Sequence, residues 1–145
     1  VRDVGLYYSA RTRDWVGRDQ PAKVQAHLAG AHKAMMYEHL QWGVLLDENV
    51  SKEALARFPV VLLPGVSILS EREVGLLRDH VAAGGGLIVT GPTGTCGAMG
   101  EPLERSVLEE LIGARLTGRL YSLDNHMSLP GADDPSHVAA PGPWS

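Results

Sequence analysis

The side chains best suited to catalysis are one cysteine and six histidines, scattered over the chain. A cysteine nucleophile needs a base within hydrogen-bonding reach, and no histidine stands in a recognisable sequence relation to Cys96. Thiolates near helix N-termini are the more reactive ones, so Cys96 remains a candidate nucleophile, with an inert structural thiol as the alternative. The histidines are His27, His32, His39, His80, His126 and His137.

The same residues offer little to a metal ion. His32 and His39 are seven positions apart and could share one face of a helix, but no carboxylate stands at metal-site spacing from them. A single cysteine can form neither an internal disulfide framework nor a cysteine-based zinc site. We therefore predict no metal site and place both histidines at the surface or at the boundary of the core.

Two segments stand where a nucleotide-binding site could lie. The glycine-rich loop Gly91–Gly100 could present backbone N–H groups to an anion, but it lacks the Gly-Lys-Ser/Thr ending of a P-loop. A flexible turn at the edge of a sheet is the alternative. A dinucleotide site needs G-x-G-x-x-G directly after the first strand, where Ser9–Arg13 reads SARTR. Asp47 stands where a ribose-binding acid would, but alone it carries little weight, and we predict no cofactor.

Four charged and aromatic side chains follow the first predicted strand: Arg11, Arg13, Asp14 and Trp15. They belong to Ser9–Gln20, a polar segment without periodicity that is unusually long for an α/β connection. Arginine and tryptophan are over-represented in the hot spots of protein interfaces. We predict an interface or ligand-facing loop here; the alternative is a solvated loop in which Trp15 packs locally.

A βαβ unit at the centre of the chain has to position these groups. Val60–Leu63 is a short apolar run, typical of a strand buried on both faces of a parallel sheet. Ser70, followed three residues later by Glu73, predicts a capping box at the start of a helix that runs to the glycines after Ala83. Leu87–Thr90 is the next apolar strand. The crossover is expected to be right-handed and the two strands parallel.

The rest of the chain continues the alternation of strands and helices. Pro102 suits a first helical turn and Gly113 a C-cap. The predicted elements are strands at Val4–Tyr8 and Trp42–Leu46, a helix over about Ala22–Gln41, a short helix capped by Ser51, a helix from Pro102 to Gly113, and weaker strands at Arg115–Leu123 and Asn125–Leu129.

This alternation predicts a three-layer α/β fold, in which a mainly parallel sheet carries helices on both faces. We expect a flavodoxin-like strand order, 2-1-3-4 with a possible fifth strand. The switch point then lies between the loops that begin at Ser9 and Pro64. We place the α/β domain at residues 1–120 and an irregular extension, dense in Pro, Gly and Ser, at 121–145.

Length and composition limit the class of protein. At 145 residues the chain is long enough for one domain with its own core. Its net charge of −4 and the lack of a basic cluster argue against nucleic-acid binding. No apolar run approaches the roughly 20 residues of a membrane-spanning helix. No signal-peptide pattern opens the chain, so we expect a cytoplasmic protein, and the start at Val1, almost directly in a strand, suggests a piece of a longer one.

Four stretches of the chain carry a resemblance to a known family: Val4–Trp15 (VGLYYSARTRDW), Ala56–Gly65 (ARFPVVLLPG), Leu69–Val74 (LSEREV) and, most closely, Val81–Gly91 (VAAGGGLIVTG). They resemble the trimerisation domain of family 42 glycoside hydrolases, the β-galactosidases. The resemblance extends over about residues 1–117, and its motifs recur in the wider class I glutamine amidotransferase-like fold.

The resemblance implies a fold that has lost its own chemistry. In catalytic members of the amidotransferase-like class, a cysteine follows the strand that corresponds to Leu87–Thr90; here that elbow reads Thr90-Gly91-Pro92. In the β-galactosidases the two catalytic glutamates lie on an upstream barrel. No glutamate can be matched to them among Glu38, Glu48, Glu53, Glu71 and Glu73.

We therefore predict a non-catalytic accessory domain of a larger, glycoside-hydrolase-like protein, with a role in oligomerisation. The resemblance implies homo-oligomers, trimers in the parent protein, and contact with the parent's own barrel. No nucleic acid or membrane is expected as a partner. Two alternatives stay open: a cysteine-dependent amidotransferase-like or protease-like enzyme that uses Cys96, and a flavodoxin-like module that binds a small ligand at the switch point.

Overall fold

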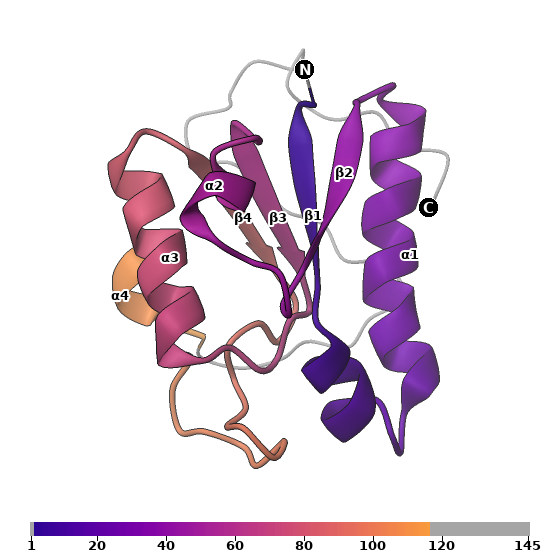
Figure 1. Ribbon diagram of the computed structural model, residues 1–145. Coiled ribbons are helices and arrows are strands. Elements are labelled where there is room, and N and C mark those ends of the chain that lie inside the picture. Colours follow the sequence, from indigo (N-terminus) through magenta and orange to yellow (C-terminus); the bar gives the residue numbers. More distant parts are fainter. Residues whose placement is uncertain (1, 117–145) are drawn as a thin grey trace, which may run out of the picture.

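A computed structural model describes residues 2–116, which form a four-stranded parallel sheet (Figure 1). Its order is β2-β1-β3-β4, as the sequence predicts, so the switch point lies between β1 and β3. Each strand begins and ends within a residue of its prediction, and β3 includes its terminal proline. The strands are β1 (Val4–Tyr8), β2 (Trp42–Leu46), β3 (Val60–Pro64) and β4 (Gly86–Thr90).

Helices cover both faces of the sheet, which confirms the three-layer α/β prediction. Among the described α-helices, the long α1 (Pro21–Tyr37) lies on one face and the three shorter ones lie on the opposite face (Figure 1). These are α2 (Lys52–Leu55), α3 (Glu71–Ala82) and α4 (Glu109–Ile112). None of the described helices is both long and apolar enough to cross a membrane.

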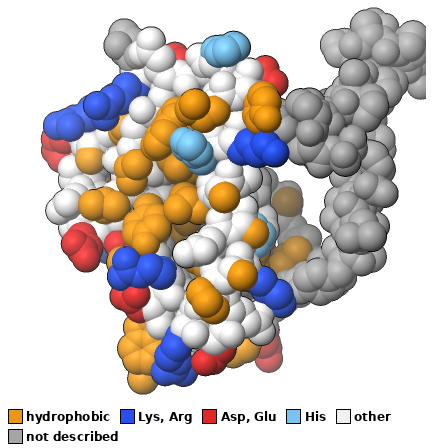
Figure 2. Space-filling model, turned by 90° about the vertical axis from the view of Figure 1, so that its right-hand side faces the viewer, with side chains coloured by type: hydrophobic (Ala, Val, Ile, Leu, Met, Phe, Trp, Pro, Cys, Tyr) orange, Lys and Arg blue, Asp and Glu red, His pale blue; other side chains and the backbone are white. Residues whose placement is uncertain are grey.

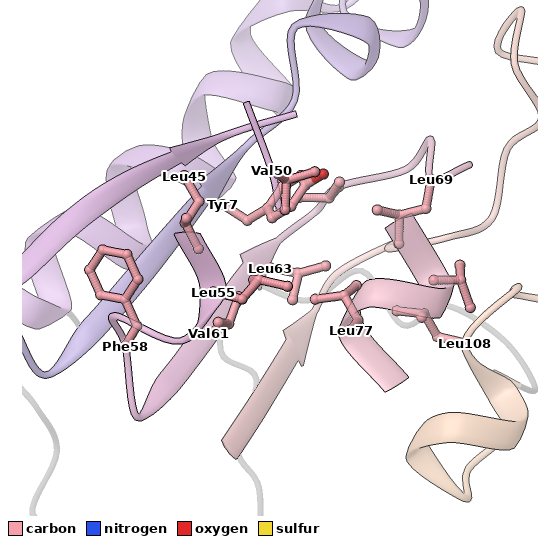
Figure 3. Close-up of a cluster of buried hydrophobic side chains, with 12 residues drawn as sticks. Tyr7, Leu45, Val50, Leu55, Phe58, Val61, Leu63, Leu69, Leu77 and Leu108 are labelled. Atoms are coloured by element: carbon pink, nitrogen blue, oxygen red, sulfur yellow. The ribbon is translucent and has the colours of Figure 1, made fainter. Parts of the chain in front are cut away.

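The larger hydrophobic core fills the space between the sheet and α3 (Figure 3). Leu63 on β3 and Leu77 on α3 are both fully buried, as the apolar stripe of α3 predicts. The smaller cluster under α1 consists of Val4, Leu6 and Met35, with Leu28 packed against it. The two faces of the sheet are therefore unequally covered.

Two glycines allow a phenylalanine to lie directly on the sheet. Gly5 and Gly43 are partners in the register of β1 and β2, and the ring of Phe58 lies over both. A Cβ on Gly5 would come within 2.9 Å of that ring, and one on Gly43 within 3.0 Å. Real Cβ atoms do not approach so closely, so any side chain at Gly5 would displace Phe58 from the core.

The first helix is shorter than predicted. It ends at Tyr37 rather than Gln41, because His39 adopts a left-handed backbone with a φ of 55°. The amide of Leu40 then bonds the carbonyl of Met35 at 3.0 Å. This is the closing turn usually made by a glycine, and no glycine marks it in the sequence.

The helix predicted from Pro102 is wrong over most of its length. Only Glu109–Ile112 is helical, closed by Gly113 at a φ of 64° as expected. The preceding residues instead form a loop held by backbone bonds, among them Leu103 N–H to the Thr95 carbonyl at 2.9 Å. Residues 115 and 116 are not in a strand. The rest of the predicted strand Arg115–Leu123, the strand Asn125–Leu129, His126, His137 and the domain boundary at residue 120 lie outside the described residues.

The irregular loop before α4 contributes Leu108 to the core, and a substitution at this position tests its contribution. Its side chain is completely buried against the cluster of Figure 3, whereas Leu103 in the same loop is 38% exposed. We expect Leu108→Ala to lower the free energy of unfolding by about 2–5 kcal/mol, as buried leucines do. Leu103→Ala, the matched control, should cost less than about 1 kcal/mol. Urea unfolding measures both; equal losses would contradict the assignment of Leu108 to the core.

Candidate functional site

The segment Ser9–Gln20 lies at the carboxyl edge of the sheet, as predicted, but it is not an aperiodic loop. Residues 10 and 11 are helical and lead into η1 (Thr12–Val16), a turn of π-helix. The amide of Gly17 bonds the carbonyl of Thr12 at 2.9 Å, the i to i+5 spacing of a π-turn. The Ser9 hydroxyl accepts the amide of Thr12 at 3.1 Å and so caps the turn.

This turn is fastened to the chain on the other side of the switch point. The hydroxyl of the buried Thr12 accepts a hydrogen bond from the amide of Ile68 at 3.1 Å. Ile68 follows β3, and Thr12 follows β1. The two loops that the strand order places at the switch point therefore meet, as predicted from the sequence.

Arg11 points inward, between two buried carboxylates. Its guanidinium makes a close ion pair with Glu73 and a longer one with Asp47, in which Nε lies 3.5 Å from Oδ2. The Arg11 backbone amide also donates to Asp47 at 3.2 Å, and the Ser9 hydroxyl donates to it at 3.0 Å. Asp47 is thus held by the segment after β1 through Oδ2, and it lines a cavity of about 330 Å³ together with Arg11 and Glu73.

Glu73 carries more hydrogen bonds than its capping role requires. The predicted capping box is present: its amide donates to the Ser70 hydroxyl, and its carboxylate accepts the Ser70 amide at 2.7 Å. The carboxylate also accepts the Tyr7 hydroxyl at 2.5 Å, and the residue is only 1% exposed. Glu73 therefore joins β1, α3 and the turn that carries Arg11. Local sequence signals predicted the cap but not these distant partners.

The electrostatics of this cluster keep both acids ionised. Burial alone would raise the pKa of Glu73, but the hydrogen bonds from Ser70, Tyr7 and Arg11 outweigh it, so the pKa lies below its ordinary value. Burial likewise opposes ionisation of Asp47, and the bonds from Arg11 and Ser9 again lower its pKa. The pKa of Tyr7 is raised by its burial and by the Glu73 carboxylate. Both carboxylates are therefore stabilised in their charged form.

The other three predicted site residues point outward. Arg13 bonds the neighbouring Asp14 at 2.6 Å and the Tyr8 hydroxyl at 3.1 Å. Trp15 is 40% exposed, and a side chain on Gly100 would lie 3.4 Å from its Cβ. The structure therefore separates the predicted set: Arg11 holds the turn, while Arg13, Asp14 and Trp15 form an exposed surface.

The side chain of His27, for which the sequence predicts no role, packs against the turn after β4. Gly65 and Gly91 end β3 and β4 with φ angles of 64° and 61°, a conformation that side chains rarely adopt. The ring of His27 lies against both, since a Cβ on either would come within 2.7 Å of it. His27 follows Val24 by three positions on the inner stripe of α1, and that spacing was the available signal.

Cys96 lies away from this elbow. Its amide donates to the Ser67 carbonyl at 2.9 Å, and its half-buried side chain borders a cavity of about 260 Å³ with Ser67, Thr95 and Pro102. Among the described residues, no histidine lines that cavity. The thiol therefore has no imidazole base beside it, which counts against the nucleophile hypothesis.

Several amides of the glycine-rich loop are bonded within the protein. Gly94 N–H donates to the Val66 carbonyl at 2.8 Å, and Met99 N–H donates to the Glu101 carboxylate at 2.9 Å. Within residues 2–116, no group of three or more His, Cys, Asp or Glu side chains is arranged to hold a metal ion. His32 is exposed and meets the Trp42 ring edge-on at 5.0 Å.

The pH dependence of unfolding tests whether Glu73 is held as a buried carboxylate. Because its pKa is lower in the folded state, its ionisation stabilises the fold above about pH 4.3, its ordinary pKa, and this contribution is lost as the pH falls towards the folded value. We expect Glu73→Gln to lower stability at pH 7 and to flatten the decline of unfolding free energy between about pH 5 and 2. Glu71→Gln, an exposed site on the same turn, should keep the wild-type slope. Identical slopes for Glu73→Gln and the wild type would contradict this.

Comparison with known proteins identifies this fold. A scan against protein-family models and a search of curated protein sequences gave no match. Among solved structures, a β-galactosidase from Bifidobacterium adolescentis is similar, with a TM-score of 0.67 and 21% sequence identity over 79% of this chain. Two structures of Gan42B, a GH42 β-galactosidase from G. stearothermophilus, have TM-scores of 0.59 and 0.54 at 17% and 16% identity, each over 72% of this chain.

The matches cover only part of the galactosidases. The chain spans 54% of the Bifidobacterium chain and 15% of each Gan42B chain. The resemblance seen in the sequence is thereby confirmed at the level of the fold. The described residues have the α/β fold of a part of family 42 β-galactosidases.

Proposed function

We propose that the chain is a non-catalytic accessory domain of a larger, glycoside-hydrolase-like protein and that it mediates homo-oligomerisation. The similarity to a limited part of β-galactosidase chains supports this. Under this proposal, the hydrolytic site belongs to another part of the protein, a barrel domain. The present chain would mediate assembly of the protein, so its exposed side chains should be suited to contacts between proteins.

The observation that carries the proposal is the elbow after β4. In the amidotransferase-like class that the sequence resembles, catalytic members carry a cysteine nucleophile at this turn. Gly91 occupies the turn and has no side chain, and the His27 ring fills the space above it. Replacing Gly91 by cysteine alone would not restore a nucleophile, because the new side chain would collide with His27.

The polar groups at the switch point support the same conclusion. Glu73 accepts hydrogen bonds from Ser70, Tyr7 and Arg11. Asp47 accepts from Ser9 and Arg11 through Oδ2, while its buried Oδ1 has no hydrogen-bond partner in the described chain. The surface beside them is formed by Arg13, Asp14 and Trp15, with Met99 68% exposed in the adjoining loop. A cavity of about 330 Å³, lined in part by Arg11, Asp47 and Glu73, also lies at this edge. A mixed surface of tryptophan, methionine and arginine has the composition of an interface core. We assign it to contact with a neighbouring subunit or with the barrel.

Enzyme assays test the lack of catalysis. We expect the chain to turn over neither a chromogenic galactoside nor glutamine, and Cys96→Ser to change nothing in either assay. Activity above the buffer blank that disappears in Cys96→Ser would restore the cysteine-enzyme alternative. Galactosidase activity that survives in Cys96→Ser but is lost in a glutamate variant would also refute the proposal.

Light scattering tests self-association through the exposed surface. The wild-type chain should form oligomers at micromolar concentration, and Trp15→Ala should weaken them roughly 30-fold, since hot-spot tryptophans contribute about 2 kcal/mol or more. Ile112→Ala is a matched control, because Ile112 on α4 is also 40% exposed. A strict monomer at all concentrations would refute an autonomous oligomerisation domain. Equal behaviour of the two variants would place the contact elsewhere.

A further inference from the structure

The cavity at the carboxyl edge of the sheet has the place and the size of a ligand site. Its volume is about 330 Å³, at the lower end of the range of small-molecule sites. The turn after β1, the end of β2 and the start of α3 all contribute to its wall. In open α/β sheets, ligands bind at this edge, outside the carboxyl ends of the strands.

The wall of this cavity is charged, unlike the groove between α1 and the sheet. That groove, of about 430 Å³, is lined mainly by apolar side chains, and Figure 2 shows hydrophobic groups gathered on this side of the molecule. The wall of the charged cavity carries four acids and two arginines, a formal excess of two negative charges, which favours a cation. These residues are Asp14, Asp47, Glu48, Glu73, Arg11 and Arg72.

One carboxylate oxygen in the wall lacks a hydrogen-bond donor. The Asp47 side chain is only 3% exposed. Its Oδ2 accepts from the Ser9 hydroxyl at 3.0 Å, and from the amide and Nε of Arg11 at 3.2 and 3.5 Å. Its buried Oδ1 has no partner within residues 2–116. Because buried polar atoms are nearly always hydrogen-bonded, this oxygen points to a donor group on a bound molecule.

Ion pairs already neutralise two of the four acids. Arg11 makes its close ion pair with Glu73, and Asp14 pairs at 2.6 Å with the arginine that precedes it. Asp47 has only the longer contact with Arg11, and the exposed Glu48 follows it directly in the chain. The negative charge that the protein does not neutralise is therefore concentrated at Asp47 and Glu48.

We propose that the cavity binds a small organic cation, whose primary ammonium group donates hydrogen bonds to Oδ1 of Asp47 and to the carboxylate of Glu48. An ammonium group is a compact charge with three donors at the end of a flexible stem. It suits an oxygen that is closed to solvent better than the hydroxyl groups of a rigid sugar ring do. The site is separate from the proposed assembly surface around Trp15.

A metal ion fits this wall less well than an organic cation. In the described part of the chain, no three or more acids, histidines or cysteines are arranged to hold a metal. The second arginine of the wall, Arg72, donates to the Val50 carbonyl at 2.9 Å and adds a positive charge that would oppose a bare metal ion.

Calorimetric titration of the chain with putrescine, a linear diamine, tests the proposal. Butane-1,4-diol is the matched neutral probe, because hydroxyl groups replace both ammonium groups on the same carbon chain. We expect one putrescine per chain, an affinity that weakens as the salt concentration rises, and no detectable heat with the diol. No heat with putrescine, or equal affinity for the diol, would refute the proposal.

Conservative variants separate the site from a general attraction of cations to a chain of net charge −4. Glu48→Gln should weaken putrescine binding roughly five-fold, as expected for an exposed charge, and Glu38→Gln, at an exposed position after α1, should not change it. Asp47→Asn should weaken binding at least about tenfold, because its charge is buried. Equal effects of the Glu48 and Glu38 variants would contradict a defined site, and this comparison does not depend on how well Asp47→Asn folds.

Amide chemical shifts provide a second readout on the unmodified chain. Putrescine should shift the signals of Arg11, Asp47 and Glu48 and leave that of Gly84, at the opposite end of the sheet, unchanged. Shifts confined to other residues would refute the site. Light scattering on the same samples measures assembly separately, because a monomeric chain that binds putrescine at these residues would support this site and contradict the assembly role alone.

Discussion

The ion pair between Arg11 and Glu73 is the interaction on which the carboxyl edge of the sheet depends. Glu73 is fully buried, and it receives Arg11 from the turn after β1 and Tyr7 from β1 itself. Removing one partner of such a pair leaves a buried charge without compensation, which is strongly destabilising. Because separating these partners would destabilise the protein, the turn, the first strand and the start of α3 are held in one arrangement. Asp47 extends the constraint to the end of β2.

The same arrangement closes the gap between the two loops at the switch point. In an open α/β sheet, ligands bind where neighbouring loops part at the carboxyl ends of the strands. Here the hydroxyl of Thr12 bonds the amide of Ile68 across that gap, and His27 packs on the glycines of the elbow. Arg11 pairs with Asp47 and Glu73 at this edge, and the three side chains line a cavity of about 330 Å³. The surface that remains is exposed and suited to contact with another protein.

The parts predicted correctly from the sequence rest on local signals. Apolar runs bounded by Pro and Gly predicted the strands, and the spacing of Ser70 and Glu73 predicted the cap of α3. The π-turn after β1 was missed because it depends on Thr12 bonding a residue 56 positions away. The helix predicted from Pro102 failed because Leu108 is drawn into the core across an irregular loop. The four predicted site residues were adjacent in sequence, yet Arg11 alone turns inward, since both of its acidic partners are distant.

The exposure of Val44 and Leu46 on β2 differs from the burial that the apolar sequence of this strand predicts. WGVLL reads as a strand covered on both faces, which is the rule for parallel sheets. On the α2 side Leu45 is indeed buried, while Val44 and Leu46 on the α1 side are not. One helix is about 10 Å wide and four strands span about 19 Å, so α1 alone cannot cover that face. Within residues 2–116, the β2 edge therefore combines the apolar composition of an interior with partial exposure of Val44 and Leu46.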